Sequence, residues 1–406
     1  MGLRKRYLWI TVGIIVLLQG GCWNLQEVES LAFVSAVGVD RAQESEKVQV
    51  TVQIARPTAL AVASTGGSSL ERAFWLVSST GYTVFDAVRN FASQSSRRLY
   101  WPHNRWLVFG EAQAREGLED VLDFFDRDVE ARRTMKLAVV QDGMASEFLE
   151  TEQEMERLAS KAYEQILDNS RRGLSTVVDI DLHQFLLALV GEGIEPVAIR
   201  VEMIDRLPDV DIRGQVERRY VSLAPRVTGA AVFKGAKLVG WSNKPETRGY
   251  NWVMGKANSG IIVIERPEGG EKLAGLELLR ASSKVKPELV DGKFKIVIEV
   301  KADANIGDIQ DILGKTNTLS AVASMERRMA TVISNEIEAV FRKTQRELAS
   351  DIFGFGRAIR RKYPKEWASL RDNWNDQGFQ ELQIETKVSA RIRHTGLGEL
   401  GLSERR

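Results

Sequence analysis

Apolar residues in the C-terminal third of the chain recur at steps of three and four. The positions that share this face are Leu319, Val322, Met325, Met329, Val332, Ile333, Ile337, Val340, Phe341 and Leu348. This spacing predicts one amphipathic helix of about thirty residues, or roughly 45 Å, which Gly354 and Gly356 are expected to end. Alternating segments precede it at residues 293–300 and follow it at residues 384–392. The order strand, long helix, strand predicts an open sheet with a helix packed across it.

The remainder of the chain mixes short strand and helix patterns. Residues 31–40 are largely apolar and predict a buried strand, whereas residues 47–54 alternate and predict a half-exposed one. Thr83 is expected to cap a helix, and residues 227–241 predict a hairpin. The expected fold class is therefore α+β and multi-domain, with mixed sheets, packed helices and a long amphipathic helix in the C-terminal domain.

A chain of 406 residues is long for a single domain. The charged, irregular stretch over residues 196–219 predicts a linker. The expected units are a signal peptide (1–21), an N-terminal α+β domain (22–195), a linker (196–226), a small middle β-rich domain (227–270), a C-terminal α+β domain (271–395) and a tail (396–406).

The N-terminus has the pattern of an export signal. Residues 4–6 are basic, and an apolar run follows over residues 7–18. As a helix this run rises roughly 18 Å, well short of the ~30 Å hydrocarbon core of a bilayer. Gly20 and Gly21 then supply small side chains directly before Cys22. The alternative is an uncleaved short anchor, and in both cases the rest of the chain is expected to be extracytoplasmic.

Cys22 is the only cysteine, so the chain can form neither an internal disulfide nor a multi-thiolate metal site. Its setting resembles the bacterial lipobox. That resemblance implies cleavage between Gly21 and Cys22, with N-acyl and S-diacylglycerol groups on the cysteine. Two acyl chains, at ~0.8 kcal/mol per buried methylene, would hold the protein stably on a membrane. Gln19 departs from the lipobox, which prefers Leu three residues before the cysteine.

Patterns that indicate catalysis are incomplete in this sequence. Residues 396–401 match a dinucleotide fingerprint, but only five residues follow, too few for the required helix and strand. Residues 249–256 have the wrong spacing for a phosphate loop. His103, His183 and His394 lie far apart, and the net charge of +1 gives no general reason to expect nucleic acid. We therefore assign no catalytic residue, metal, cofactor or ligand-binding residue, and an enzyme is not expected.

Three segments carry a joint resemblance. They are Gly-Cys-Trp-Asn-Leu at 21–25 leading to Val-Gly-Val-Asp at 37–40, Thr-Gly-Ala-Ala-Val-Phe-Lys at 228–234 leading to 237–241, and Asp-Ile-Phe-Gly-Phe-Gly at 351–356 with Trp367 and Trp374. Together they resemble the Ger(x)C family, the C subunits of nutrient germinant receptors in spore-forming Gram-positive bacteria. The resemblance covers nearly the whole mature chain. Asn24 stands where that family usually has Asp.

The resemblance implies a non-catalytic lipoprotein on the outer face of the spore inner membrane. It implies assembly with an integral A subunit and a transporter-like B subunit for nutrient-triggered germination, and a three-domain α+β fold. Phe353, Phe355, Trp367 and Trp374 are expected to fill core beneath the long helix, the alternative being a partner surface. A second hypothesis is a solute-binding lipoprotein that delivers a small molecule to a transporter. Such proteins normally have two similar α/β lobes, and the sequence shows no internal duplication.

Overall fold

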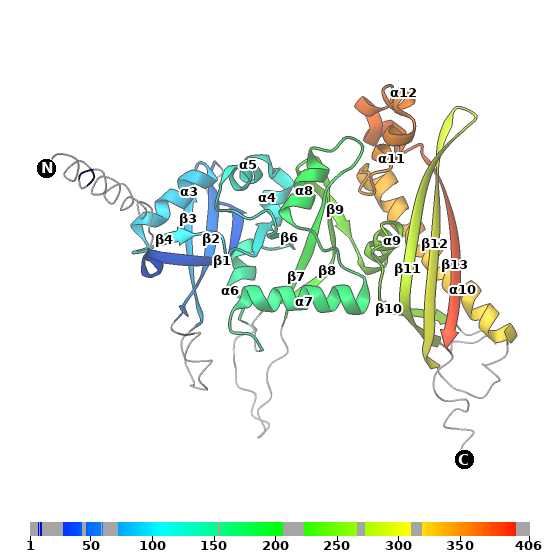
Figure 1. The fold of residues 1–406 in the computed structure, drawn as a ribbon, viewed down its shortest axis with the longest axis horizontal. Helices are drawn as coiled ribbons and strands as arrows, with labels where there is room; N and C mark the ends of the chain where they lie inside the picture. The colour runs from blue at the N-terminus through cyan, green and yellow to red at the C-terminus, as the bar shows by residue number, and fades with distance from the viewer. Residues whose placement is uncertain are drawn as a thin grey trace, which may run out of the picture.

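The computed structural model describes residues 7, 9, 27–42, 46–57, 59, 72–152, 155–205, 223–265, 273–309 and 319–394. These residues form a nine-stranded and a four-stranded sheet, which lie side by side along the long axis of the molecule (Figure 1). Helices pack on both sheets, so the predicted α+β, multi-domain class is confirmed. The two sheets differ in strand number and order, unlike the paired lobes of a solute-binding protein.

The large sheet has the order β3-β2-β1-β5-β6-β7-β8-β9, with β4 paired to the start of β1. Its strands are β1 (Leu31–Arg41), β2 (Val48–Ala55), β3 (Phe74–Gly81), β4 (Arg98–Tyr100), β5 (Trp106–Gly110), β6 (Lys136–Gln141), β7 (Val197–Asp205), β8 (Leu223–Lys234) and β9 (Lys237–Ser242). The central strands β1, β5, β6 and β7 are parallel, and antiparallel strands extend the sheet on both sides. Continuous apolar runs in β5 and β6 are buried on both faces, as parallel strands require.

Helices between these strands cover the large sheet. They are α3 (Val84–Asn90), α4 (Glu111–Glu116), α5 (Glu119–Arg127), α6 (Ala145–Glu150), α7 (Ala159–Leu174) and α8 (Leu182–Leu189). The predicted cap of α3 is confirmed, because the Thr83 side chain accepts a hydrogen bond from the Asp86 N–H. The predicted half-exposure of β2 is wrong. Thr51 and Gln53 are fully buried, and the Gln53 amide donates to the carbonyl of Leu149 in α6 at 2.9 Å.

The small sheet is built as the C-terminal pattern predicts. Its strands, in order, are β10 (Gly260–Glu265), β11 (Leu273–Val290), β12 (Lys293–Ile309) and β13 (Gln383–His394). Helix α10 (Leu319–Arg342) crosses one face, continues as the π-helical segment η4 (Lys343–Leu348), and buries the predicted apolar side from Met325 to Phe341. Leu319, the first residue of the predicted side, is 92% exposed. The predicted end of this helix is wrong, because Ala349, with φ of 48°, terminates it before Gly354 is reached.

The predicted linker over residues 196–226 also needs correction. It begins with β7, which pairs with β6 on one side and β8 on the other, while residues 206–222 lie outside the described part. The charged residues of this stretch suggested an exposed linker. Two of them, Arg200 and Glu202, instead form an ion pair on a half-buried strand. The predicted middle domain is likewise not separate, since the β8–β9 hairpin completes the large sheet. Helix α9 (Lys244–Val253) then leads to β10 in the small sheet.

Helix α9 packs against α10 through a buried carboxylate. Glu336 is 7% exposed and accepts hydrogen bonds from Arg248 Nε at 2.9 and 3.0 Å and from Trp252 Nε1 at 2.8 Å. Gly249 allows the close approach, because a Cβ there would stand 2.2 Å from the Glu336 carbonyl oxygen. The glycine that seemed to belong to a phosphate loop therefore serves helix packing.

Glu336→Ala should lower the free energy of unfolding by roughly 3 kcal/mol, because it leaves a half-buried guanidinium and a buried indole N–H without their acceptor. Urea denaturation of the full chain measures this loss. Glu338→Ala, an exposed glutamate on the same helix, is the matched control and should change the value by less than about 0.5 kcal/mol. Equal effects of the two variants would contradict the assignment.

Candidate functional site

Cys22, the one residue with a predicted chemical role, lies outside the described residues, as do Gln19, Gly21 and the fingerprint at 396–401. Its cleavage and acylation stay predictions. The chain enters β1 at Leu31, nine residues after Cys22. Nine residues span at most about 31 Å, so the start of β1 must lie near whatever holds the cysteine. Across the described ranges, no helix combines the length and apolar character needed to cross a bilayer.

The three histidines do not come together. His103 packs its ring against Phe33 and Tyr100, with centroid distances of 5.5 and 5.8 Å. His183 is exposed on the first turn of α8, and His394 ends β13. Within the described ranges no three His, Cys, Asp or Glu side chains are grouped to hold a metal ion.

The third sequence segment forms a buried hydrogen-bonded centre around Asp351, which is fully buried. Five groups donate to its carboxylate: the N–H groups of Phe353, Gly354 and Phe355 to Oδ1 at 3.0–3.2 Å, and the Gly356 N–H and Trp374 Nε1 to Oδ2 at 2.9 Å each. The carboxylate thereby satisfies the free N–H groups at the start of α11 (Phe355–Lys362). Burial raises the pKa of Asp351 to about 6, against the opposing effect of these donors.

The same segment joins the C-terminal region to the large sheet. The Asp351 carbonyl accepts from the Glu195 N–H at 2.8 Å, just before β7. Asn375 donates to the Glu195 carboxylate, which also accepts from the Gly235 N–H in the β8–β9 turn. Ser350 Oγ donates to the Phe233 carbonyl at 2.6 Å. We call residues 350–356, together with the 193–195 and 233–235 segments that they contact, the junction.

Backbone also meets backbone within the junction. The Arg357 N–H donates to the Gly193 carbonyl at 3.0 Å. A Cβ on Gly356 would lie 2.7 Å from Gly193 Cα and equally close to the rings of Trp367 and Trp374. Only a residue without a side chain fits between these groups.

The predicted core role of the third segment is confirmed. Phe353 and Phe355 stack at 5.0 Å, and both rings pack on Phe341 of the long helix at 4.7 and 5.5 Å. Trp367 and Trp374 contact each other at 5.2 Å and are buried. The sequence marked Asp351 only as the first residue of the third segment, and it did not single out Glu195, whose partners Gly235 and Asn375 lie 40 and 180 residues away.

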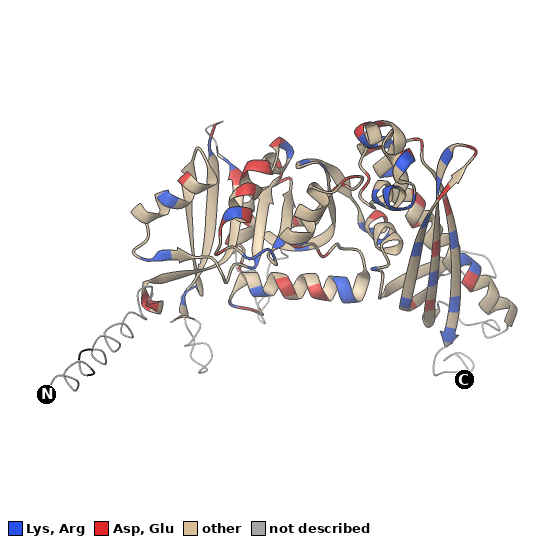
Figure 2. Cartoon of the chain, turned by 45° about the horizontal axis from the view of Figure 1, so that its top comes forward, with Lys and Arg blue, Asp and Glu red and all other residues tan. Residues whose placement is uncertain are grey.

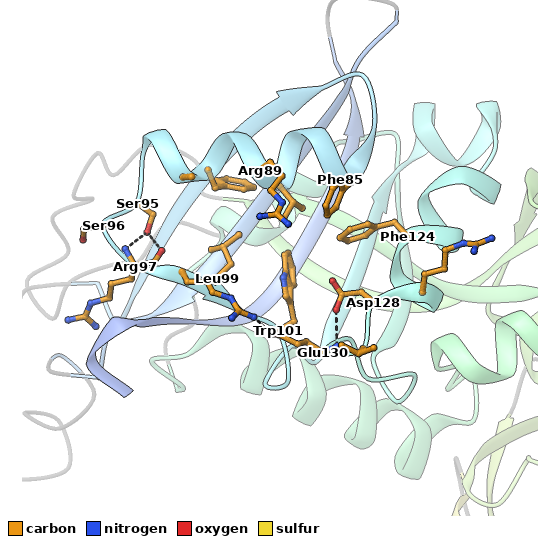
Figure 3. Close-up of a pocket in the computed structure, with 16 residues that line it drawn as sticks. Phe85, Arg89, Ser95, Ser96, Arg97, Leu99, Trp101, Phe124, Asp128 and Glu130 are labelled. Carbon is orange, nitrogen blue, oxygen red and sulfur yellow. Dashed lines mark hydrogen bonds and ion pairs between the residues drawn. The ribbon is translucent and has the colours of Figure 1, made fainter. Parts of the chain in front are cut away.

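A groove lies at the outer end of the large sheet, between α3, β4 and the end of α5 (Figure 3). Its volume is about 860 Å³, and Leu99, Trp101 and Phe124 line it. Phe85 stands at its rim, 54% exposed, with its ring 6.1 Å from that of Phe124 and 4.9 Å from the Arg89 guanidinium carbon. We call this the Phe85 groove.

The Phe85 groove adjoins the point where the chain enters from Cys22. Arg98, which lines the groove, pairs in parallel register with Leu31 at the start of β1. Val129, 98% exposed, also lines the groove. An exposed aromatic and an exposed aliphatic side chain beside a hollow are typical of an interaction surface.

Two family models match the chain in succession. The model of the spore germination protein N-terminal domain matches residues 24–203, and that of the spore germination B3/GerAC-like C-terminal domain matches residues 228–396. The chain belongs to the Ger(x)C family of spore germination proteins. The two models meet within the region where β7 passes to β8 in the large sheet, so neither coincides with a single sheet.

Ger(x)C relatives in Bacillus subtilis (strain 168) match over nearly their full length. Spore germination protein KC is 28% identical over 401 residues, covering 97% of each chain. Spore germination protein A3 is 23% identical, covering 94% of this chain and 96% of its own. The crystal structure of the GerBC protein has a TM-score of 0.55 at 18% identity and covers 90% of this chain and 99% of its own. That structural likeness confirms the fold.

The first Ger(x)C segment also places a buried acid at a helix start. Asp40, at the end of the Val-Gly-Val-Asp motif, accepts from the N–H groups of Ala145 and Ser146 at 2.7 and 3.0 Å at the start of α6. Burial raises its pKa. The aspartates in two of the three motifs therefore accept hydrogen bonds from the first N–H groups of a helix. Asp351 also accepts one from the buried Trp374 indole.

The Asp351 carboxyl should make stability pH-dependent. Its pKa is about 6 in the folded protein and near 3.9 in an unfolded chain. Between these values the native state binds the proton more tightly, so raising the pH from about 3 to about 7 should remove up to about 3 kcal/mol of stability, of which about 2 kcal/mol is lost from pH 4 to 6. Denaturant unfolding of wild type and Asp351→Asn across this range measures the effect as a difference that changes with pH and levels off above about pH 7. A constant difference would contradict the assignment.

Proposed function

We propose that this Ger(x)C chain is a non-catalytic lipoprotein subunit of a nutrient germinant receptor. In this proposal it assembles with integral membrane A and B subunits and is required for nutrient-triggered spore germination. The observation that carries the proposal is the match over 97% of both chains to a spore germination protein, with both family domains present in order. The buried aspartates of the shared motifs support a structural role for those motifs, since each is occupied by helix N–H groups.

We further propose that Cys22 anchors the protein on the outer face of the spore inner membrane. The support is the basic, apolar and small-residue order that precedes the cysteine. In this arrangement the start of β1 lies within about 31 Å of the anchor, and β4 and the Phe85 groove lie beside it.

Cys22→Ala should abolish acylation, release the protein from the spore membrane fraction and lower the germination response to nutrients. Acyl labelling, fractionation and the loss of optical density after nutrient addition measure these three effects. Gln19→Leu, which restores the residue preferred in a lipobox, is the matched control and should keep all three. Normal germination of Cys22→Ala spores on every nutrient would remove the function proposed for the anchor.

We assign the contact with the integral subunits to the Phe85 groove. Phe85→Glu should reduce co-purification of those subunits at least tenfold, because it places a charge on the exposed apolar rim. Leu187→Glu on α8 is the matched control, since Leu187 is similarly exposed at 53% and lies outside the groove. Unchanged circular dichroism of both variants shows that the fold is intact. Undiminished co-purification of Phe85→Glu would overturn the assignment.

A further inference from the structure

The small sheet has one open face. Helix α10 covers the side that carries Ile296, Ile298 and Val300, and the opposite side of β11, β12 and β13 faces solvent. Lysine and arginine recur along these three strands in Figure 2, more often than acidic residues. The excess of basic over acidic residues is concentrated at one place on this face.

Strand register brings a set of donors together there. Lys301 lies between Ser282 on β11 and Ser389 on β13, and the three residues form one row. In the adjacent row, Asp303 lies between Arg280 and Arg391. Neighbouring strands lie about 4.8 Å apart, and same-face residues along a strand lie roughly 6.7 Å apart, so these side chains surround one small space.

That space is a groove of about 390 Å³, which we call the β11–β13 groove. Four cations and one acid line it, Asp303 being the acid, which leaves a net lining charge of +3 (4 − 1). Asp303 is already engaged, since it accepts from Arg280 Nε at 2.7 Å and Arg393 Nη2 at 3.0 Å. Those hydrogen bonds, that from Arg393 first, hold its pKa below the usual value.

Lys301 and Arg391 remain as free cations in the groove. Neither forms an ion pair or a side-chain hydrogen bond with any residue that the structure describes. The hydroxyls of Ser282 and Ser389 stand on either side of Lys301 and are exposed. Two uncompensated cations with two neutral donors match the acceptor-rich surface of a phosphate group, since arginine binds phosphate in a bidentate manner and lysine adds a point charge.

The surrounding charges restrict the size of the ligand. In the next row, Glu299 accepts from Lys286 at 2.6 Å. In the row beyond it, Glu385 forms ion pairs with Lys295 and Lys387. These carboxylates interrupt the positive surface beyond the groove. A long polyanion such as nucleic acid needs a continuous basic track, whereas a single phosphate group does not.

We propose that the β11–β13 groove binds a phosphate group, carried either by an anionic phospholipid headgroup or by a soluble phosphate. Lys301 and Arg391 supply the charge, and Ser282 and Ser389 donate hydrogen bonds. The site is independent of the anchor and of the Phe85 groove, and it does not depend on the receptor role proposed above.

The test is phosphate-dependent stabilisation of the purified full chain in detergent. Inorganic phosphate, compared with sodium chloride at equal ionic strength, should raise the unfolding temperature in a saturable way. The double variant Lys301→Gln/Arg391→Gln should weaken the apparent phosphate affinity at least tenfold while unfolding cooperatively without phosphate. The control Lys284→Gln/Lys293→Gln removes the same charge outside the groove and should retain the affinity. Equal affinity in the groove variant and wild type, or an equal loss in the control, would overturn the proposal.

A second arm identifies the source of the phosphate. The full chain is placed in vesicles of phosphatidylcholine alone or with phosphatidylglycerol, and the response to added phosphate is measured again. Loss of the response only with phosphatidylglycerol assigns the groove to anionic headgroups. A response that persists in both assigns it to a soluble phosphate. If neither preparation of wild type responds more than the groove variant does, the site does not exist.

Discussion

The acceptance of five hydrogen bonds by the Asp351 carboxylate organises the C-terminal side of the junction between the two sheets. It holds the start of α11 in place, and the residues around it contact the segment before β7 and the β8–β9 turn. A buried carboxylate is stable only when its oxygens are fully hydrogen-bonded, so the chain must bring all of its donors to this one point. The junction thus acts together with the contacts of Asn251 and Ser259 to the Ser175 segment in setting how the large sheet meets the small one.

Sequence periodicity correctly predicted the strands and the helix that bury only one of their faces. The alternation in β12 and β13 and the spacing in α10 were sufficient because each has one face in the core. The same reasoning failed for β2, where buried Thr51 and Gln53 satisfy their polar groups against neighbouring elements and so resemble solvent-facing residues in sequence. Periodicity gave no prediction for β11, whose exposed positions include Arg280, Ser282 and Lys284. The Asp291–Gly292 turn that joins β11 to β12, with both φ angles positive, was the local signal available for that hairpin.

The site was harder to predict than the fold. Recognition of the three segments led to the family, and the aromatic residues of the third were correctly expected in the core. The role of Asp40 arises from contacts with backbone more than a hundred residues away, which spacing within one sequence does not report. The backbone contacts of Asp351 are local, but the sequence marked this residue only as part of the third segment. The β11–β13 groove could not be predicted from local spacing either, because strand register brings together residues from three separate segments.

The close approach of Gly193 and Gly356 has a mechanical consequence. Side chains at an interface can change rotamer and absorb a small displacement, whereas two backbones in direct contact cannot. Any change in how the large sheet meets α11 at this point therefore has to move main chain, and a side chain introduced at either glycine would force the two segments apart.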